Sequence, residues 1–159
     1  MNSTPALSKT LRILVAHGVN LDLLGKREPH IYGCEGLADI ETLLRKVSPV
    51  LAQSMGLQPP ELFFFQTNHE GLFLDKLSES WDGALINAGA WTHTSLALAD
   101  RLVGLGLPFA EVHLSNLAKR EPFRQHSYAA PHAQGVSFGF GLGSYVSGLS
   151  GLYYRLSRI

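Results

Sequence analysis

The chain has 159 residues, of which 45% are hydrophobic, and its 13 Lys and Arg residues balance 13 Asp and Glu residues. This length fits one domain with a sizeable core. The charge balance removes the electrostatic reason to expect nucleic acid or an anionic membrane as the partner. We therefore expect a single domain over residues 1–159, with a core from about 11 to 157, a flexible extension over 1–10 and a small-molecule ligand.

The first residues and the cysteine content bear on location. Cys34 is the only cysteine, so it cannot form a disulfide within the chain. The first residues lack the apolar core of a signal peptide, and no apolar run approaches the roughly 18 residues that a membrane helix needs. These features predict a cytoplasmic protein.

Strands and helices alternate along the sequence. Residues 11–16 are a short apolar run rich in β-branched side chains, typical of a strand buried on both faces. Apolar residues at helical spacing predict a helix over 37–55 that Pro49 should kink or break. The pattern then repeats, with strands expected over 62–66, 83–87, 108–112 and 135–140, and helices over 71–80, 94–105 and 142–156. This series predicts a flavodoxin-like three-layer α/β/α sandwich with a five-stranded parallel sheet, a fold whose ligands bind at the carboxyl ends of the strands.

Unusual polar side chains follow four of these strands, where such a fold binds its ligand. They are His17, Asn20, Arg27 and Tyr32 after the first strand, Asn68, His69 and Glu70 after the second, Asn87, Trp91, Thr92 and His93 after the third, and His113, Ser115, Asn116, Arg120 and Arg124 after the fourth. Because the carboxyl ends of parallel strands share one edge of a sheet, we expect these groups to form one site.

The fourth strand carries a carboxylate and an imidazole. Glu111 and His113 are two residues apart, so on a strand they point to the same face. A carboxylate beside an imidazole fixes its tautomer and raises its proton affinity, which suits an acid catalyst, although such pairs are also common as purely structural contacts. Arg120 and Arg124 are four apart, so a short helix there would present both guanidiniums to a carboxylate ligand.

Three glycine-containing segments connect the elements. Residues 25–33 have the form of a mobile flap carrying Arg27 and Tyr32, or of a solvated loop with a packed tyrosine. In residues 87–95, Thr92 or Thr94 would cap the following helix, and free backbone N–H groups there would hold an anion or simply belong to an ordinary cap. Residues 139–143 are interpreted as a tight turn between the last strand and the last helix.

The histidines raise the alternative of a metal site. His17, His93, His113 and Glu111 all lie at expected strand ends and could surround a cation. However, the chain has no HxH motif, HExxH motif or carboxylate cluster, and the neighbouring arginines would repel a cation. We therefore expect no metal and no cofactor, with a metal-dependent hydrolase as the less favoured alternative.

Four blocks of sequence resemble one enzyme family, the type II 3-dehydroquinate dehydratases. The blocks cover residues 17–33 (HGVNLDLLGKREPHIYG), 66–71 (QTNHEG), 87–95 (NAGAWTHTS) and 111–127 (EVHLSNLAKREPFRQHS). They occur in the family's order and spacing, and the resemblance extends from about residue 11 to 149. It implies a flavodoxin-like fold, trimers assembled as dodecamers, and a lyase that converts 3-dehydroquinate into 3-dehydroshikimate by anti elimination through an enolate, without a cofactor.

The resemblance also implies roles for individual residues. Tyr32 would be the base, with Arg27 beside it, His113 the acid paired with Glu111, and Asn20 the stabiliser of the enolate through a bound water. The remaining positions would serve substrate binding: Asn87, His93, Ser115, Arg124, the backbone at Leu114, the supporting Arg120, and Asp100, which would reach a neighbouring subunit's site.

The chain departs from the family's usual pattern at a few positions. The first block begins His17-Gly-Val19-Asn20-Leu-Asp22 where Asn-Gly-Pro-Asn-Leu-Asn is usual, and Ala88 and Ala118 replace a common Pro and a usual His. These changes bear on affinity and lid behaviour more than on the type of reaction. The remaining alternative is a binding module for a small anion that keeps the pocket without turnover. The sequence leaves open whether the reaction serves aromatic biosynthesis or quinate breakdown.

Overall fold

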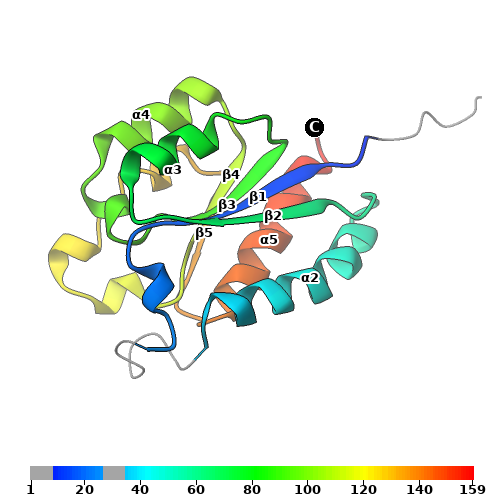
Figure 1. The fold of residues 1–159 in the computed structure, drawn as a ribbon. Coiled ribbons are helices and arrows are strands. Elements are labelled where there is room, and N and C mark those ends of the chain that lie inside the picture. The colour runs from blue at the N-terminus through cyan, green and yellow to red at the C-terminus, as the bar shows by residue number, and fades with distance from the viewer. Residues whose placement is uncertain (1–8, 27–34) are drawn as a thin grey trace, which may run out of the picture.

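A computed structural model describes residues 9–26 and 35–159 of the chain. Five parallel strands form one sheet in the order β2-β1-β3-β4-β5. The strands are β1 (Arg12–His17), β2 (Glu61–Gln66), β3 (Gly83–Asn87), β4 (Phe109–His113) and β5 (Gly135–Phe138), and the helices are α2 (Leu37–Ser54), α3 (Glu70–Leu77), α4 (Leu96–Leu105) and α5 (Gly143–Leu156). The predicted flavodoxin-like α/β sandwich is confirmed (Figure 1). The first eight residues of the expected extension lie outside the described part of the chain.

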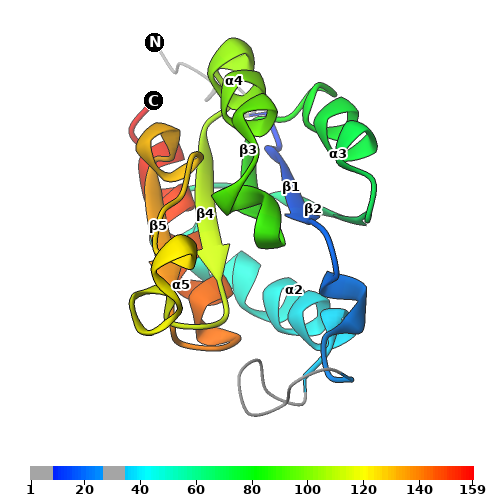
Figure 2. The ribbon, with the colours of Figure 1, turned by 90° about the vertical axis from the view of Figure 1, so that its left-hand side faces the viewer.

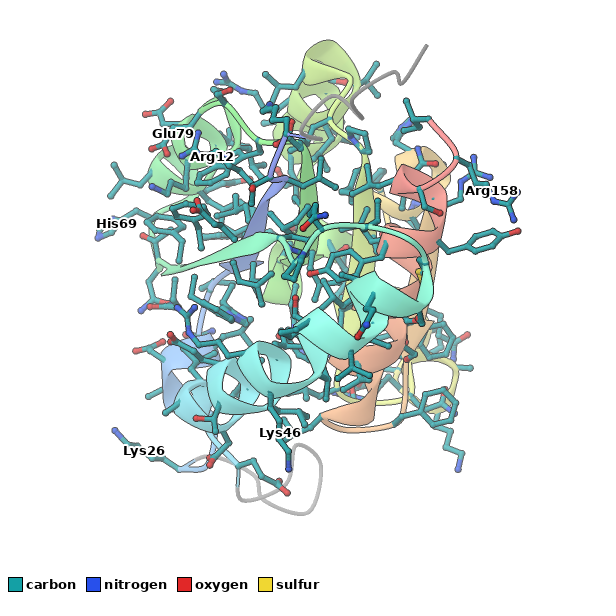
Figure 3. The ribbon with its side chains drawn as sticks, turned by 90° about the vertical axis from the view of Figure 1, so that its right-hand side faces the viewer. Arg12, Lys26, Lys46, His69, Glu79 and Arg158 are labelled. Carbon is teal, nitrogen blue, oxygen red and sulfur yellow. The ribbon has the colours of Figure 1, made fainter. Side chains whose placement is uncertain are left out.

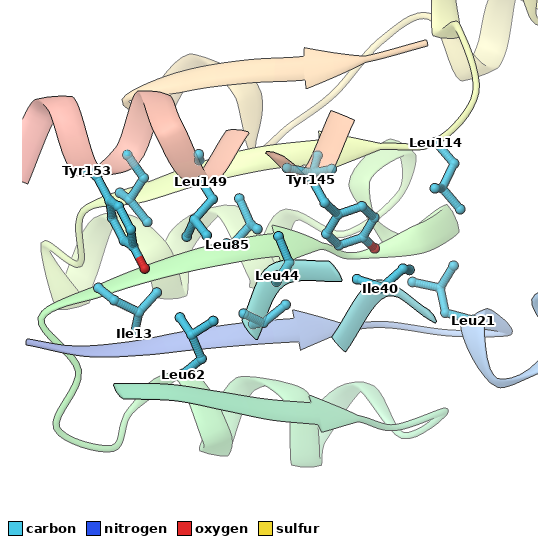
Figure 4. Packing of buried hydrophobic residues seen from close by; sticks show 14 of the residues in the cluster. Ile13, Leu21, Ile40, Leu44, Leu62, Leu85, Leu114, Tyr145, Leu149 and Tyr153 are labelled. Atoms are coloured by element: carbon cyan, nitrogen blue, oxygen red, sulfur yellow. The ribbon is translucent and has the colours of Figure 1, made fainter. Parts of the chain in front are cut away.

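Two helices cover each face of the sheet (Figure 1). Because side chains alternate along a strand, Ile13 and Val15 of β1 pack with α2 and α5, whereas Leu14 and Ala16 pack with α3 and α4. Figure 4 shows the core on the α2 and α5 side, where Leu44 packs among sheet residues. Leu44 is fully buried, so its replacement by alanine should cost about 2–5 kcal/mol of stability.

Helix α2 runs unbroken through Pro49, so the expected break is wrong. A proline removes one backbone N–H and leaves the carbonyl four residues earlier, at Arg45, without its helical partner. Both Arg45 and Pro49 are exposed, so water can bond to that carbonyl. The buried face of the helix, which includes Ile40, Leu44 and Ala52, keeps α2 on the sheet.

The polar loops gather at the carboxyl edge of the sheet. Figure 2 shows the 3-10 helix η1 (Leu21–Leu23, blue) after β1 and the segment of η3 (Leu117–Lys119) and η4 (Pro122–Arg124, yellow) near the end of β4, whereas η5 (Ala130–His132) leads into the start of β5. Charged side chains such as those of Lys46 and Arg158 point outward in Figure 3. Within the described ranges, no helix is long and apolar enough to span a membrane.

Candidate active site

A cavity of about 130 Å³ opens at the carboxyl ends of β1, β3 and β4. It brings together eight of the residues expected in the site: Asn20, Asn87, His93, His113, Leu114, Ser115, Arg120 and Arg124. The leucines Leu21, Leu23, Leu24 and Leu117 supply apolar wall. Convergent polar groups on a partly apolar wall are typical of a site for a small organic anion.

Glu111 and His113 form a buried pair on β4, as their spacing predicts. Nε2 of His113 lies 2.7 Å from Oε1 of Glu111, and the two residues are only 6% and 1% exposed. Since an ionised carboxylate can only accept, Nε2 carries the proton in this contact. Nδ1 of His113 is the ring nitrogen left for a ligand in the cavity.

Two hydroxyl groups hold the Glu111 carboxylate. Thr92 Oγ1 donates to Oε1, and Ser127 Oγ lies 2.9 Å from both carboxylate oxygens. Burial acts to raise the pKa of Glu111, but the hydrogen bond and charge of His113, together with these hydroxyls, outweigh it and hold the pKa below its usual value. Glu111 is therefore ionised at neutral pH.

Thr92 is therefore not the cap of the next helix. It lies in the 3-10 helix η2 (Gly89–His93), and Ser95 caps α4 by accepting from the Leu98 N–H at 2.9 Å. Thr94 does not cap α4 either. The η2 turn delays the start of α4 and leaves the Thr92 hydroxyl buried against Glu111.

His93 faces the cavity with a fixed ring. Its Nδ1 lies 2.7 Å from the carbonyl oxygen of His126, so Nδ1 donates and the other ring nitrogen of the neutral form accepts. Burial lowers the pKa of His93, and it prevails over the raising effect of that carbonyl. The His93 ring stacks at 6.2 Å on the ring of His113, so an acceptor lies beside the proposed proton donor.

Arg120 and Arg124 both line the cavity, but not from one helix as predicted. Pro122 favours an extended residue before it, and Glu121 has φ −56° and ψ 146°, which separates η3 from η4. The Glu121 carboxylate lies 3.3 Å from Nε of each arginine. Two guanidiniums thus meet around one carboxylate at the mouth of the site.

The loop that carries Asn20 packs directly on the loop after β3. A Cβ at Gly18 would lie 2.3 Å from the Ala88 carbonyl oxygen, and one at Gly89 would lie 2.7 Å from that of Val19. Asn20 itself is left-handed, with φ 65°, and its N–H donates to Asn68 Oδ1 at 2.7 Å. The two loops are therefore held together by the close backbone contacts at Gly18 and Gly89. The side-chain amide of Asn68, which follows β2, also holds Asn20 in place.

Three other expected site residues are not among the described residues that line this cavity. Arg27 and Tyr32 lie outside the described residues, as do Cys34 and most of the expected flap. Asp100 is exposed on α4 and is not part of the cavity lining. Within residues 9–26 and 35–159, no group of three or more His, Cys, Asp or Glu side chains is placed to hold a metal ion.

Comparison with known proteins assigns the family. Residues 11–153 match the model of the family described as dehydroquinase class II. The chain is 50% identical to a 3-dehydroquinate dehydratase of Nostoc sp. over 149 residues, covering 92% of this chain and 97% of the relative. It is 49% identical to a 3-dehydroquinate dehydratase of Azorhizobium caulinodans over 148 residues, covering 92% and 95% of the two chains. The chain belongs to the class II dehydroquinases.

A solved structure agrees with this family. The type II dehydroquinase of Butyrivibrio crossotus superimposes with a TM-score of 0.80 at 35% identity, covering 90% of this chain and 97% of that one. The sequence does not predict that the hydroxyls of Thr92 and Ser127 hold Glu111. The pattern around Thr92 predicts a helix cap by Thr92 or Thr94 instead, and no local pattern links Ser127 to a carboxylate 16 residues earlier.

Proposed function

We propose that this chain is a hydro-lyase that eliminates water from 3-dehydroquinate to give 3-dehydroshikimate, by an anti route through an enolate and without a cofactor. The observation that carries the proposal is the buried Glu111 and His113 pair at the wall of a cavity rimmed by two arginines, in a chain of the dehydroquinase family. Such a pair supplies a proton donor beside a site for a carboxylate.

In the first step, the Tyr32 phenolate removes a proton from the carbon beside the substrate ketone. A tyrosine with a pKa near 10 is a weak base at neutral pH, and the Arg27 guanidinium favours its ionised form. The electron pair of the broken C–H bond moves toward the ketone oxygen and forms the enolate. Asn20, acting through a water, stabilises the charge that develops there.

In the second step, the enolate re-forms the ketone, its carbon–carbon electron pair forms the new double bond to the carbon that carries the departing hydroxyl, and the carbon–oxygen bond of that hydroxyl breaks. His113 gives a proton from Nδ1 to that oxygen, which leaves as water. In this step His113 passes from the imidazolium, with protons on both ring nitrogens, to the neutral imidazole. Glu111, which stays ionised, stabilises the imidazolium before the transfer and holds Nε2–H throughout. The proton that Tyr32 took returns to solvent or to His113 before the next turnover.

Binding uses the other polar groups of the cavity. Arg124, supported by Arg120, would bind the substrate carboxylate in place of the Glu121 contact. Asn87, His93, Ser115 and the backbone N–H of Leu114 would hold the hydroxyls and the carboxylate. The leucine wall would pack against the ring carbons.

The test is an absorbance assay for the conjugated enone product with purified protein and 3-dehydroquinate. Tyr32→Phe should cut kcat at least about a hundredfold while substrate still binds, because a proton-transfer catalyst is removed. Tyr154→Phe, an exposed tyrosine on α5, is the matched control and should leave kcat unchanged. Binding without product by the unaltered protein would instead support the binding-module alternative.

The working enzyme is further proposed to be a cytoplasmic homo-oligomer, built from trimers into a dodecamer. Asp100 is exposed on α4, away from its own chain's cavity, so it can serve a site only across a subunit contact. Asp100→Ala should lower activity or loosen the oligomer without unfolding the subunit. Light scattering and an assay over a dilution series measure this, and a stable, fully active monomer would contradict it.

A further inference from the structure

Asn87, at the end of β3, has its side-chain amide held from both sides. Oδ1 accepts from the backbone N–H of Gly89 at 3.2 Å, and Nδ2 lies 2.9 Å from the Tyr145 hydroxyl. A backbone N–H can only donate, so the oxygen must face Gly89 and the nitrogen must face Tyr145. This orientation leaves one Nδ2–H of Asn87 available at the cavity wall.

The Tyr145 hydroxyl has a second partner, His17. His17 Nδ1 lies 3.1 Å from the hydroxyl oxygen, and both residues are buried, at 2% and 0% exposed. His17 and Asn87 are also direct neighbours across the paired strands β1 and β3. Because the Tyr145 oxygen already accepts from Asn87, its own proton is directed to Nδ1 of His17.

The direction of this chain requires one form of His17. Nδ1 accepts, so the ring must be neutral with its proton on Nε2. Burial supports this form, since it lowers the pKa of His17 to about 4. A proton on Nδ1 would instead point two donors at the Tyr145 oxygen and take away the acceptor of the buried Tyr145 O–H, and turning the Asn87 amide to compensate would set Nδ2 against the Gly89 N–H.

We propose that His17 and Tyr145 are positioning residues that keep the amide of Asn87 turned with an N–H toward the cavity, so that the site selects a ligand oxygen acceptor at that point. The inference rests on the proposed function for the identity of the ligand. The hydrogen bonds run from Asn87 Nδ2 to the Tyr145 oxygen and from the Tyr145 hydroxyl to His17 Nδ1. Neither His17 nor Tyr145 is among the residues that line the cavity.

Tyr145→Phe removes the middle of this chain and should raise KM about three- to tenfold, with a smaller change in kcat, as for the loss of a neutral hydrogen bond. Tyr153→Phe is the matched control. Tyr153 is equally buried on α5 and its hydroxyl lies 2.6 Å from Ser48 Oγ, but it lies at the other end of the helix, near Ile13, as Figure 4 shows. This control should lose stability like Tyr145→Phe and keep the KM.

Two substitutions at His17 distinguish the role of its Nδ1 as a hydrogen-bond acceptor from the role of the side chain in filling space. Asn places its Oδ1 as far from the backbone as the Nδ1 of His, whereas Leu fills similar space without an acceptor. His17→Leu should raise KM as Tyr145→Phe does, and the double variant should be no worse than either single one. His17→Asn keeps the acceptor, so its KM should stay near that of the unaltered protein. Additive effects, or an unchanged KM in Tyr145→Phe, would overturn the inference.

The tautomer of His17 can be determined by a measurement that does not depend on enzyme activity. ¹⁵N NMR of the unaltered protein, with the His17 signal assigned by its loss in His17→Asn, should show a proton on Nε2 and none on Nδ1 at pH 7. A proton on Nδ1 would overturn the inference even if the variants fail to fold. Absence of product in the dehydratase assay would remove the proposed function, while the NMR result would still decide the direction of the hydrogen bonds.

Discussion

His17 and His113 lie at the carboxyl ends of strands β1 and β4, and both are almost fully buried, yet the protein gives them opposite surroundings. His113 has the Glu111 carboxylate at 2.7 Å, whereas His17 has the neutral Tyr145 hydroxyl at 3.1 Å. A carboxylate can stabilise a charged imidazole, and a hydroxyl in an apolar core cannot compensate for its desolvation. Burial at a strand end therefore does not make a histidine a proton carrier; its partner does.

The largest expected difference is in turnover. His113→Asn should lower kcat by about 10²–10⁴-fold, because it removes the proposed general acid. His17→Asn changes the same residue type at the other strand end and should change kcat by no more than a few-fold. Measurement of kcat for both variants compares the two histidines directly. Equal losses would show that the Glu111 partner does not distinguish them.

The second difference is in the pH dependence of stability. The pKa of His17 is about 4 in the folded chain against an ordinary 6.5, so the unfolded chain binds the extra proton between these values. The contribution of His17 to the free energy of unfolding is therefore fully present above pH 6.5 and falls as the pH drops toward 4. From pH 7 to pH 5 this single residue should cost about 2 kcal/mol.

Urea unfolding at pH 7 and pH 5 measures this loss. His17→Asn should remove about 2 kcal/mol of the pH dependence, whereas His132→Asn, at an exposed position, should leave it unchanged. An identical pH dependence in the unaltered protein and in His17→Asn would mean that His17 is protonated in the folded chain.

A smaller effect is expected at the hydroxyls behind His113. Ser127→Ala removes a hydrogen bond to Glu111 and also releases the N–H groups of Ala129 and Ala130. It should cost about 1–2 kcal/mol of unfolding free energy and lower kcat several-fold. Ser157→Ala, whose hydroxyl bonds an exposed backbone carbonyl, is the control. A Ser127→Ala variant with unaltered kcat would show that Thr92 and His113 hold Glu111 without it.

No effect at all is expected from removal of metal ions. Exhaustive chelation should leave kcat unchanged. The partner of His113 is the Glu111 carboxylate, and the two arginines at the rim of the cavity would repel a cation. Assays before and after chelation, with divalent ions added back, measure this. Activity that returns only with zinc or another divalent ion would favour the metal-dependent alternative.

Most of the fold can be predicted from the sequence, because the spacing of apolar residues and the positions of turn-forming residues determine each strand and helix locally. β3 was predicted at its observed bounds, and most other element ends moved by only one or two residues. The unbroken α2 could not be predicted, since the outcome at Pro49 depends on which face of the helix meets water. The separation of Arg120 from Arg124 was within reach, because Pro122 between them is itself a local signal.

The site was predictable where strand spacing alone decides geometry, as for Glu111 and His113. It was not predictable where partners come from distant parts of the chain. Ser127 contacts Glu111 across 16 residues of sequence, and Tyr145 contacts His17 across 128, so only the tertiary fold brings these pairs together. Sequence patterns thus locate the reacting groups better than the groups that orient them.

The contacts of Gly18 and Gly89 have a consequence for redesign of the pocket. The loop that presents Asn20 and the loop that follows Asn87 touch backbone to backbone, with no room for a side chain at either glycine. A substitution that pushes one loop outward must therefore move the other with it. Asn20 and Asn87 therefore cannot be moved independently of each other. A substrate of different shape would be accommodated at the arginine side of the cavity, because the wall there consists of side chains that can be substituted one at a time.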